Sequence, residues 1–414
     1  TVLKLGDGVN SGVLRIINDN ITVMRIGIDA NRDNNPDFSG GISCYKTTNV
    51  KFVEIEVYNF RDFGILSWLS KGTRITRCYV HDGYQRAIHI KSSYLNVVKS
   101  NFIEDIERNG IVIEAVESDA YGNVIEANVI RNCGTDGGIN LYSQGAPDYL
   151  ARRNIVKGNI ILDCTERGIY IDGAPENIIE GNYIINSSWI AISLNSSYSY
   201  RNKIHANFTY RGRVGVGLEN APTKNHISEN IILTPDYQGI YIPVNCDENI
   251  VEENYIVNPG EANPSEDFNR SGILVNACNV IVRRNVIVDE RDTPLMPYGV
   301  YEGDNGSGNY IISNVIRNAT IAGVRRYTAV VKRNIGYPTE NSGVAVFSGD
   351  GSTTEFKIEH GLVSTPSKYG VSPLTPDAHA DKTISADDTY IIITFSTAPP
   401  SGTDNLKFGW WAEV

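Results

Sequence analysis

A six-residue pattern, Asn-x-Ile/Val-x-x-Asn, recurs along this chain and constrains its fold more than any other feature. Full copies begin at Asn96, Asn123, Asn154, Asn177, Asn202, Asn225, Asn249 and Asn309. Two further copies, at 280–285 and 329–334, lack the first Asn. The second Asn residues of successive copies lie 20 to 31 positions apart. This spacing is typical of solenoid repeats.

A second signature, Gly-Ile, follows many copies nine or ten residues after the second Asn, as at Gly110-Ile111, Gly138-Ile139 and Gly168-Ile169. Short runs of β-branched residues broken by Asn and Gly predict strands joined by tight turns. We therefore predict an all-β fold, a right-handed single-stranded parallel β-helix of about 12 coils. Equivalent residues of successive coils should then stack in columns.

The repeat ends near Tyr337-Pro338, and a different texture follows. Residues 1–338 are predicted to form the β-helix, with a degenerate repeat over residues 1–95. An N-terminal cap is expected to be missing, because residue 1 runs straight into strand-like sequence and a solenoid end is an open sheet edge. Residues 339–414 alternate in the manner of antiparallel strands and predict a small β-sandwich.

Composition excludes some functions. The formal net charge of the 414 residues is −11 and no basic run occurs, so no nucleic-acid partner is expected. No apolar stretch approaches the roughly 20 residues that span a bilayer, so no membrane partner is expected either. Six cysteines lack metal-type spacing. Cys133 and Cys164 each follow a repeat Asn by five residues and should stack, as two buried thiols or, less favoured, as a disulfide.

The repeat asparagines invite a catalytic interpretation, which we reject. An Asn at a turn bonds its own backbone and tolerates left-handed geometry. A ladder of them is therefore expected to be structural.

We expect the functional residues on the strand that begins with the Gly-Ile signature. Side chains alternate across a strand, so the second and fourth residues after the Gly point outward. The fourth positions are, in chain order, Trp68, Lys91, Glu114, Tyr142, Asp172, Asn195 and Glu219. The second positions include His89, Asn140 and Tyr170. Aromatic rings, carboxylates and amides in one row favour a sugar groove over a merely solvated sheet.

Two reactions fit this row. In the first, Glu114 and Asp172 are the general acid and base of a glycoside hydrolase. Their backbones should lie roughly 9.6 Å apart across two coils, near the ~6.5–9.5 Å carboxyl separation of inverting enzymes. In the second, Lys91 neutralises a uronate and Tyr142 or His89 abstracts a proton, giving elimination or epimerisation. The bland alternative is a stacked Lys91–Glu114 ion pair of small worth.

The expected substrate-binding residues are Trp68, Tyr170, Asn140, Asn195 and Glu219. A further polar column, Asp82, Asp105, Asn132 and Asp163, shares a register at a turn. Stacked carboxylates there fit Ca²⁺, but turn capping by Asp is the favoured explanation. No metal site and no required cofactor are therefore predicted.

The Asn-x-Ile-x-x-Asn and Gly-Ile pattern over residues 49–334 resembles the pectate-lyase-like superfamily of carbohydrate-active β-helices. This resemblance implies polysaccharide lyases, inverting glycosidases, epimerases or phage depolymerases. No catalytic motif of those groups is present beyond a faint echo at HIKSS (89–93). The sequence of residues 340–414 resembles C-terminal modules of bacteriophage tail and tailspike-like proteins. This resemblance implies trimerisation or glycan binding.

Together these observations predict an extracellular or virion-surface depolymerase, a homotrimer that acts on a polysaccharide, with other tail proteins as further partners. Hydrolysis is favoured over lyase or epimerase chemistry, because an acidic chain disfavours a strongly anionic substrate. Two alternatives remain: a non-catalytic glycan-binding spike, and a periplasmic accessory protein of the same coil family.

Overall fold

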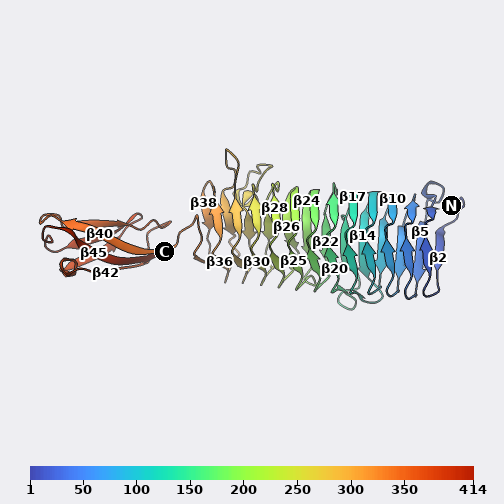
Figure 1. Cartoon of the computed structure of the whole chain (residues 1–414), viewed down its shortest axis with the longest axis horizontal. Coiled ribbons are helices and arrows are strands. Elements are labelled where there is room, and N and C mark those ends of the chain that lie inside the picture. Colours follow the sequence, from blue (N-terminus) through green and yellow to red (C-terminus); the bar gives the residue numbers. More distant parts are fainter. The chain divides into compact units, whose positions relative to one another are not determined.

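A parallel β-solenoid accounts for most of the chain, and residues 1–414 are all described in a computed structural model. Each turn places short strands on three faces, and Figure 1 shows the strands of successive turns side by side. The first face is a sheet of 13 strands, one per turn. The predicted right-handed parallel β-helix is confirmed, with about 13 turns where about 12 were expected.

The strands divide by face. The first face consists of β3 (Thr22–Met24), β6 (Lys51–Val53), β9 (Arg74–Thr76), β12 (Val97–Lys99), β16 (Val124–Glu126), β20 (Ile155–Lys157), β23 (Ile178–Glu180), β25 (Lys203–His205), β27 (His226–Ser228), β30 (Ile250–Glu252), β33 (Ile281–Arg283), β36 (Tyr310–Ile312) and β39 (Val330–Lys332). The second face consists of β1 (Val2–Lys4), β4 (Gly27–Asp29), β7 (Glu56–Tyr58), β10 (Tyr79–Gly83), β13 (Phe102–Ile106), β17 (Val129–Cys133), β21 (Ile160–Leu162), β28 (Ile231–Leu233), β31 (Tyr255–Val257), β34 (Val286–Val288) and β37 (Val315–Arg317). The third face consists of β2 (Ser11–Ile16), β5 (Ser39–Tyr45), β8 (Phe63–Trp68), β11 (Arg86–Lys91), β14 (Asn109–Ala115), β18 (Ile139–Ser143), β22 (Ile169–Asp172), β29 (Ile240–Ile242), β32 (Ile273–Val275), β35 (Tyr298–Glu302) and β38 (Ala322–Arg325).

Two long strands, β24 (Tyr183–Asn195) and β26 (Phe208–Glu219), run through both the second and the third face. A small extra pair, β15 (Ala120–Tyr121) and β19 (Ala151–Arg152), joins two neighbouring turns. The only helical segments are three 3₁₀ turns, η1 (Arg32–Asn34), η2 (Asp267–Arg270) and η3 (Pro376–His379). No helix of the chain has the length and apolarity needed to cross a membrane.

The core of the solenoid is a stack of aliphatic side chains. The second residue of most second-face strands points inward, and Val80, Ile103, Ile130 and Ile161 are fully buried there. These residues lie opposite one another in register from turn to turn. β-branched side chains suit this position because they pack well on a pleated surface.

Two ladders of buried asparagines join the turns. In one of them the Oδ1 atom of Asn159 accepts from the backbone N–H and the Nδ2 of Asn128, at 3.0 and 2.9 Å. The Nδ2 of Asn159 donates to the carbonyl of Ile125 (3.1 Å) and to Oδ1 of Asn182 (2.9 Å). Each amide thus satisfies buried backbone groups at a turn, so the ladder is structural.

The predicted mechanism of the ladder is wrong in detail. The left-handed residue is the one before the ladder asparagine, as at Ser100 (φ 57°), Ala127 (φ 54°) and Arg153 (φ 53°). The asparagines bond mainly to neighbouring turns rather than to their own backbone, because the turn before them directs the side chain inward along the stack.

The Gly of the Gly-Ile signature is explained by close backbone approach. A Cβ on Gly110 would lie 2.5 Å from the carbonyl oxygen of Gly138, and one on Gly239 would lie 2.8 Å from that of Gly272. A very small residue is favoured there, because successive turns stack closely; Ala87 and Ala191 take the same position in two other turns.

The chain divides into two compact units, residues 1–310 with 318–329, and residues 311–317 with 330–414. In the second unit, β40 (Glu340–Gly349), β45 (Gly402–Glu413) and β42 (Lys368–Pro373) form one antiparallel sheet. A second sheet contains β41 (Glu355–Glu359), β44 (Tyr390–Phe395) and β43 (Lys382–Ala386). Phe356, Ile393 and Phe408 pack in one shared core, as a sandwich requires.

Cys133 and Cys164 are buried free thiols that contact each other. The hydrogen bond between them, followed by burial, raises the pKa of Cys133 well above its ordinary value. The disulfide alternative is therefore not what the structure shows.

Candidate functional site

The row of outward residues on the third face is continuous. Strand register places Trp68, Lys91, Glu114, Tyr142, Asp172, Asn195 and Glu219 at equivalent positions of seven successive turns. His89, Asn140 and Tyr170 lie two residues earlier on the same strands. We call this surface the groove row.

The expectation that the whole row is solvent-exposed is wrong for three members. His89, Glu114 and Asn140 retain only 5, 4 and 6% of their exposure. Successive rows are roughly 4.8 Å apart, so longer neighbours cover shorter side chains. The buried members form the floor of the surface rather than its rim.

His89 and Glu114 form a buried pair. The Nε2 atom of His89 lies 2.9 Å from Oε2 of Glu114. A carboxylate can only accept, so Nε2 carries the proton. Burial lowers the pKa of His89 despite this hydrogen bond. Burial opposes ionisation of Glu114, but the hydrogen bond from His89 and nearby positive charge outweigh it and lower the pKa of Glu114.

The alternative of a Lys91–Glu114 ion pair is not what the structure shows. The Nζ atom of Lys91 instead lies 5.0 Å from the ring centroid of Trp68, in cation–π geometry. Glu114 has its hydrogen bond with His89 on the neighbouring strand.

Asp172 lies in a second polar cluster. Its Oδ1 accepts from Nδ2 of Asn195 at 3.0 Å, and its Oδ2 accepts from the hydroxyl of Tyr170 at 3.3 Å. Burial raises the pKa of Asp172, although these two hydrogen bonds and Arg167 act against it. Burial also raises the pKa of Tyr170 strongly. The two carboxyl groups of the row therefore shift in opposite directions, Glu114 down and Asp172 up.

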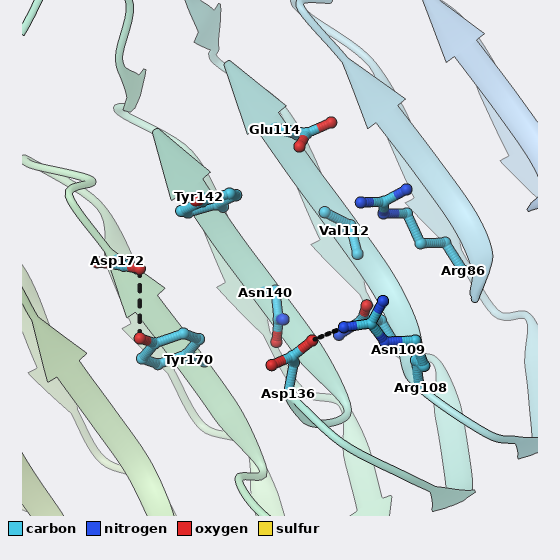
Figure 2. Close-up of a pocket in the computed structure, with 10 residues that line it drawn as sticks. All are labelled: Arg86, Arg108, Asn109, Val112, Glu114, Asp136, Asn140, Tyr142, Tyr170 and Asp172. Atoms are coloured by element: carbon cyan, nitrogen blue, oxygen red, sulfur yellow. Dashed lines mark hydrogen bonds and ion pairs between the residues drawn. The ribbon is translucent and has the colours of Figure 1, made fainter. Parts of the chain in front are cut away.

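Tyr142 lies between Glu114 and Asp172 on the intervening strand, and Figure 2 shows the three side chains on successive strands. Burial and the charges of Asp172 and Glu114 raise the pKa of Tyr142. Its phenol therefore holds its proton at neutral pH.

A hollow of about 300 Å³ lies over these side chains (Figure 2). Sequence reasoning missed four of its residues, Arg86, Arg108, Asn109 and Asp136. All four lie one or two residues before the Gly or Ala position. Arg86 and Asn109 begin their strands, and Arg108 and Asp136 lie in the bend or turn before a strand, so alternation counted from the Gly does not predict their direction. The missed signal was a polar or charged residue at this place in three successive coils.

One residue that lines this hollow has a buried side-chain atom without a partner. The Oδ1 atom of Asn140 has no hydrogen bond, although Asn140 lines the hollow and is 6% exposed. Buried polar atoms are nearly always satisfied. The Oδ1 atom is closed to solvent, so it becomes available to a ligand hydroxyl only when the Asn140 side chain turns.

The same face carries further hollows at both ends of the row. One of about 250 Å³ is lined by Tyr45 and Trp68, whose ring centroids are 4.8 Å apart. The other, of about 200 Å³, is lined by Trp189, Tyr241 and Glu219. Glu219 accepts from Ser193 (2.7 Å) and Arg167 (3.1 Å). Aromatic and polar groups thus border the row from β8 to β29.

The turn column has a structural explanation. Asp82, Asp105, Asn132 and Asp163 all adopt left-handed backbone conformations, with φ between 51 and 56°. The Nδ2 of Asn132 donates to Asp105 at 2.9 Å. No group of three or more His, Cys, Asp or Glu that could hold a metal ion occurs in residues 1–414.

Comparison with known families gives one match. The model of a family described as periplasmic copper-binding protein (NosD) matches residues 15–233 and 116–267. The two overlapping matches span more than half of the chain. No curated protein sequence matches it.

Solved structures share the fold at low sequence identity. The tailspike protein of E. coli bacteriophage HK620 has 11% identity, with coverage of 100% of this chain and 86% of that one. Its TM-score is 0.60, or 0.56 in complex with a pentasaccharide. The N-terminal fragment of bacteriophage Phi29 gene product 12 has 16% identity, coverage of 80% and 60%, and a TM-score of 0.60. The GH136 lacto-N-biosidase of Eubacterium ramulus has 11% identity, coverage of 69% and 62%, and a TM-score of 0.53.

Proposed function

This chain belongs to the family of the periplasmic copper-binding protein NosD, and we propose that it uses the β-solenoid to bind and cleave a polysaccharide along its third face. The observation that carries the proposal is a pair of carboxyl groups with opposite pKa shifts, Glu114 and Asp172, in one hollow with an unpartnered buried amide oxygen. Solved structures of the same fold include a tailspike bound to a pentasaccharide, which supports a sugar as the ligand.

Copper does not fit the residues present. Copper favours thiolate, thioether and imidazole ligands, yet the chain has no cluster of three potential metal ligands among His, Cys, Asp and Glu. Its two methionines lie far apart in sequence, Met24 on β3 and Met296 before β35. No step of the proposed reaction involves a metal. Ca²⁺ at the turn carboxylates stays an untested alternative.

The proposed reaction is hydrolysis. Asp172, with its raised pKa, donates a proton to the glycosidic oxygen as that bond breaks. Glu114, ionised and held by His89, takes a proton from the water that attacks the anomeric carbon. One water is consumed and both carboxyl groups are reset by solvent. The two-turn separation suits the inverting geometry, which leaves room for this water.

Substrate contacts follow from the rest of the groove row. Trp68 and Tyr170 offer sugars the ring faces that Lys91 and Arg167 leave free. Asn140, Asn195 and Glu219 offer hydrogen bonds to hydroxyls. We propose an extracellular or virion-surface location, where the chain would meet polysaccharides that lie outside cells. A homotrimer, in which residues 339–414 assist assembly or bind glycan, completes the proposal, with other tail proteins as further partners.

Proton abstraction by a lyase or epimerase is the second candidate. It is less well supported, because Lys91 contacts Trp68, His89 contacts Glu114, and the raised pKa of Tyr142 opposes its use as a base. A spike that only binds glycan is the third candidate.

A polysaccharide panel separates these three functions. New reducing ends without absorbance of an unsaturated uronate would indicate hydrolysis, which we expect. Absorbance of that product would indicate elimination and contradict the proposal. Binding without new ends on any polysaccharide would indicate a spike without catalysis.

A further inference from the structure

Outward residues of the second face become apolar midway along the solenoid. In the early turns these positions include His81, Glu104 and Arg131 on β10, β13 and β17. From β21 onward, the first and third residues of six successive strands are all apolar or aromatic. These twelve residues, here named the apolar stripe, are Ile160, Leu162, Tyr183, Ile185, Phe208, Tyr210, Ile231, Leu233, Tyr255, Val257, Val286 and Val288.

Several members of the apolar stripe are open to solvent. The exposed fractions of Tyr183, Ile231 and Ile160 are 54, 42 and 41%. The ring of Phe208 lies 5.5 Å from that of Tyr183, centroid to centroid. A solvent-facing sheet ordinarily places polar residues outward. A large contiguous apolar surface instead marks a protein interface.

The first face of the same turns offers an internal comparison. The third residue of each first-face strand also points outward. These residues include Lys157, Glu180, His205 and Glu252. The fold itself therefore does not demand an apolar exterior. Something specific to the second face does.

We propose that the apolar stripe is the surface through which three copies of this chain associate, with the stripes facing a common three-fold axis parallel to the solenoids. The inference deepens the homotrimer of the proposed function by naming its contact surface. It does not depend on the reaction at the groove row, which lies on the third face.

The rise of the solenoid favours a second copy over an unrelated partner. Rows on the stripe repeat every ~4.8 Å over about 24 Å. A three-fold axis parallel to the stack brings equivalent rows of three chains to the same height. The first residues of the six strands form one column of the stripe and the third residues form the other. Side chains in the first column of one chain then meet, row by row, those in the second column of its neighbour. A partner with a different repeat would match only a few rows.

Charge agrees with this choice. The stripe leaves roughly 600–800 Å² open, mostly on its first four strands because Val257 and Val288 are only 6 and 7% exposed, and a three-fold axis divides that area between two neighbours, about half of a standard interface for each. The chain carries a formal net charge of −11, so two copies repel on average. The stripe itself contains no charged residue, and Glu290 borders it through a hydrogen bond from the hydroxyl of Tyr255 (3.3 Å), so two copies approach there with few carboxylates between them.

The test is the mass of the full chain in solution, by light scattering coupled to gel filtration. We expect three times 45.6 kDa for the wild type. The double variant Tyr183→Lys, Phe208→Lys should elute as a 45.6 kDa monomer. The matched control, Ile155→Lys, Ile178→Lys, makes the same kind of change at two adjacent outward positions of the first face and should stay trimeric.

Three results would overturn the inference: a wild type of one or two chains, a stripe variant that remains trimeric, or a control that dissociates equally. A monomeric wild type that binds lipid vesicles or another protein through the stripe counts among these. If the lysine variant lost its β-sheet circular dichroism, Tyr183→Thr, Phe208→Thr would replace it, since Thr favours strands. Glycan cleavage by a monomeric wild type would overturn the stripe and the proposed homotrimer, and leave the proposed reaction standing.

Discussion

The imidazole of His89 and the carboxylate of Glu114 lie 2.9 Å apart on adjacent strands β11 and β14, and each side chain is 6% exposed. A buried carboxylate without a donor would tend to bind a proton. The hydrogen bond from His89 reverses this tendency and keeps Glu114 ionised. In the proposed hydrolysis, His89 is accordingly a positioning residue that prepares Glu114 as a base.

The pH dependence of stability reports on this pair. The pKa of His89 is lowered by burial from 6.5. As pH falls below 6.5, the unfolded chain takes up a proton that the folded imidazole resists, so stability declines with falling pH. The lowered pKa of Glu114 acts in the same direction, but at pH below 4.5. Thermal melts between about pH 5 and 6.5 should show the decline, and His89→Gln should flatten it. An unchanged slope in the variant would mean that His89 titrates normally.

Tyr142 distinguishes hydrolysis from elimination. Under hydrolysis its phenol only lines the hollow between the two carboxyl groups, so Tyr142→Phe should retain kcat within about tenfold. Lys91→Ala should raise KM more than it lowers kcat, because Lys91 contacts Trp68 at the end of the row. Kinetics on the best polysaccharide of the panel would check both. Loss of ~10²-fold or more in kcat for Tyr142→Phe would point to proton abstraction by the phenol.

The asparagine ladder should carry much of the stability of the solenoid. Asn159→Ala removes an amide that makes four hydrogen bonds to Asn128, Ile125 and Asn182. Buried groups that lose their partners cost ~1–3 kcal/mol each, so unfolding should require clearly less denaturant. Asn186→Ala serves as the control, because its side chain makes one exposed bond to Asp163. Equal losses in the two variants would contradict a special role for the ladder.

The Gly-Ile signature predicts a steric limit. In Gly110→Ala the new methyl group would meet the carbonyl of Gly138 at 2.5 Å, so adjacent turns must separate and the melting temperature should fall by several degrees. Gly12→Ala on β2 is the matched change, since its nearest neighbour would lie at 3.7 Å. Comparison of the two melting temperatures checks the prediction, which fails if Gly110→Ala melts like the wild type.

The fold was predictable because the repeat is written in the spacing of Asn and Gly-Ile. Stacking in register also gave the order of the groove row, since one signature residue per turn fixes the alternation of the strand. The burial of His89 and Glu114 was not predictable, because it depends on how far the neighbouring side chains extend over them. Likewise Arg86 and Asp136 precede the signature, at the start of a strand and in a turn, and only coordinates show that they line the hollow.

The hydrogen-bond partner of Glu114 was not predictable from the sequence, for a related reason. Register places Glu114 beside both Lys91 and Tyr142, and alternation alone does not say which donor it meets. Glu114 on β14 lies directly opposite Lys91 of β11. It instead forms its hydrogen bond with His89, two residues before Lys91 on that strand. The orphaned oxygen of Asn140 is invisible for the same reason, since satisfaction of a buried amide is a property of its whole surroundings.

The most direct measurement is the rate of reducing-end release by Glu114→Gln and Asp172→Asn, beside the wild type and Glu126→Gln. Glu126 lies on β16 of the first face, in the same turn as Glu114, and its replacement should leave the rate unchanged. Loss of a general acid or base costs ~10²–10⁴-fold, so both groove variants should fall by that factor while still binding the polysaccharide. Groove variants as active as Glu126→Gln would contradict cleavage at the third face.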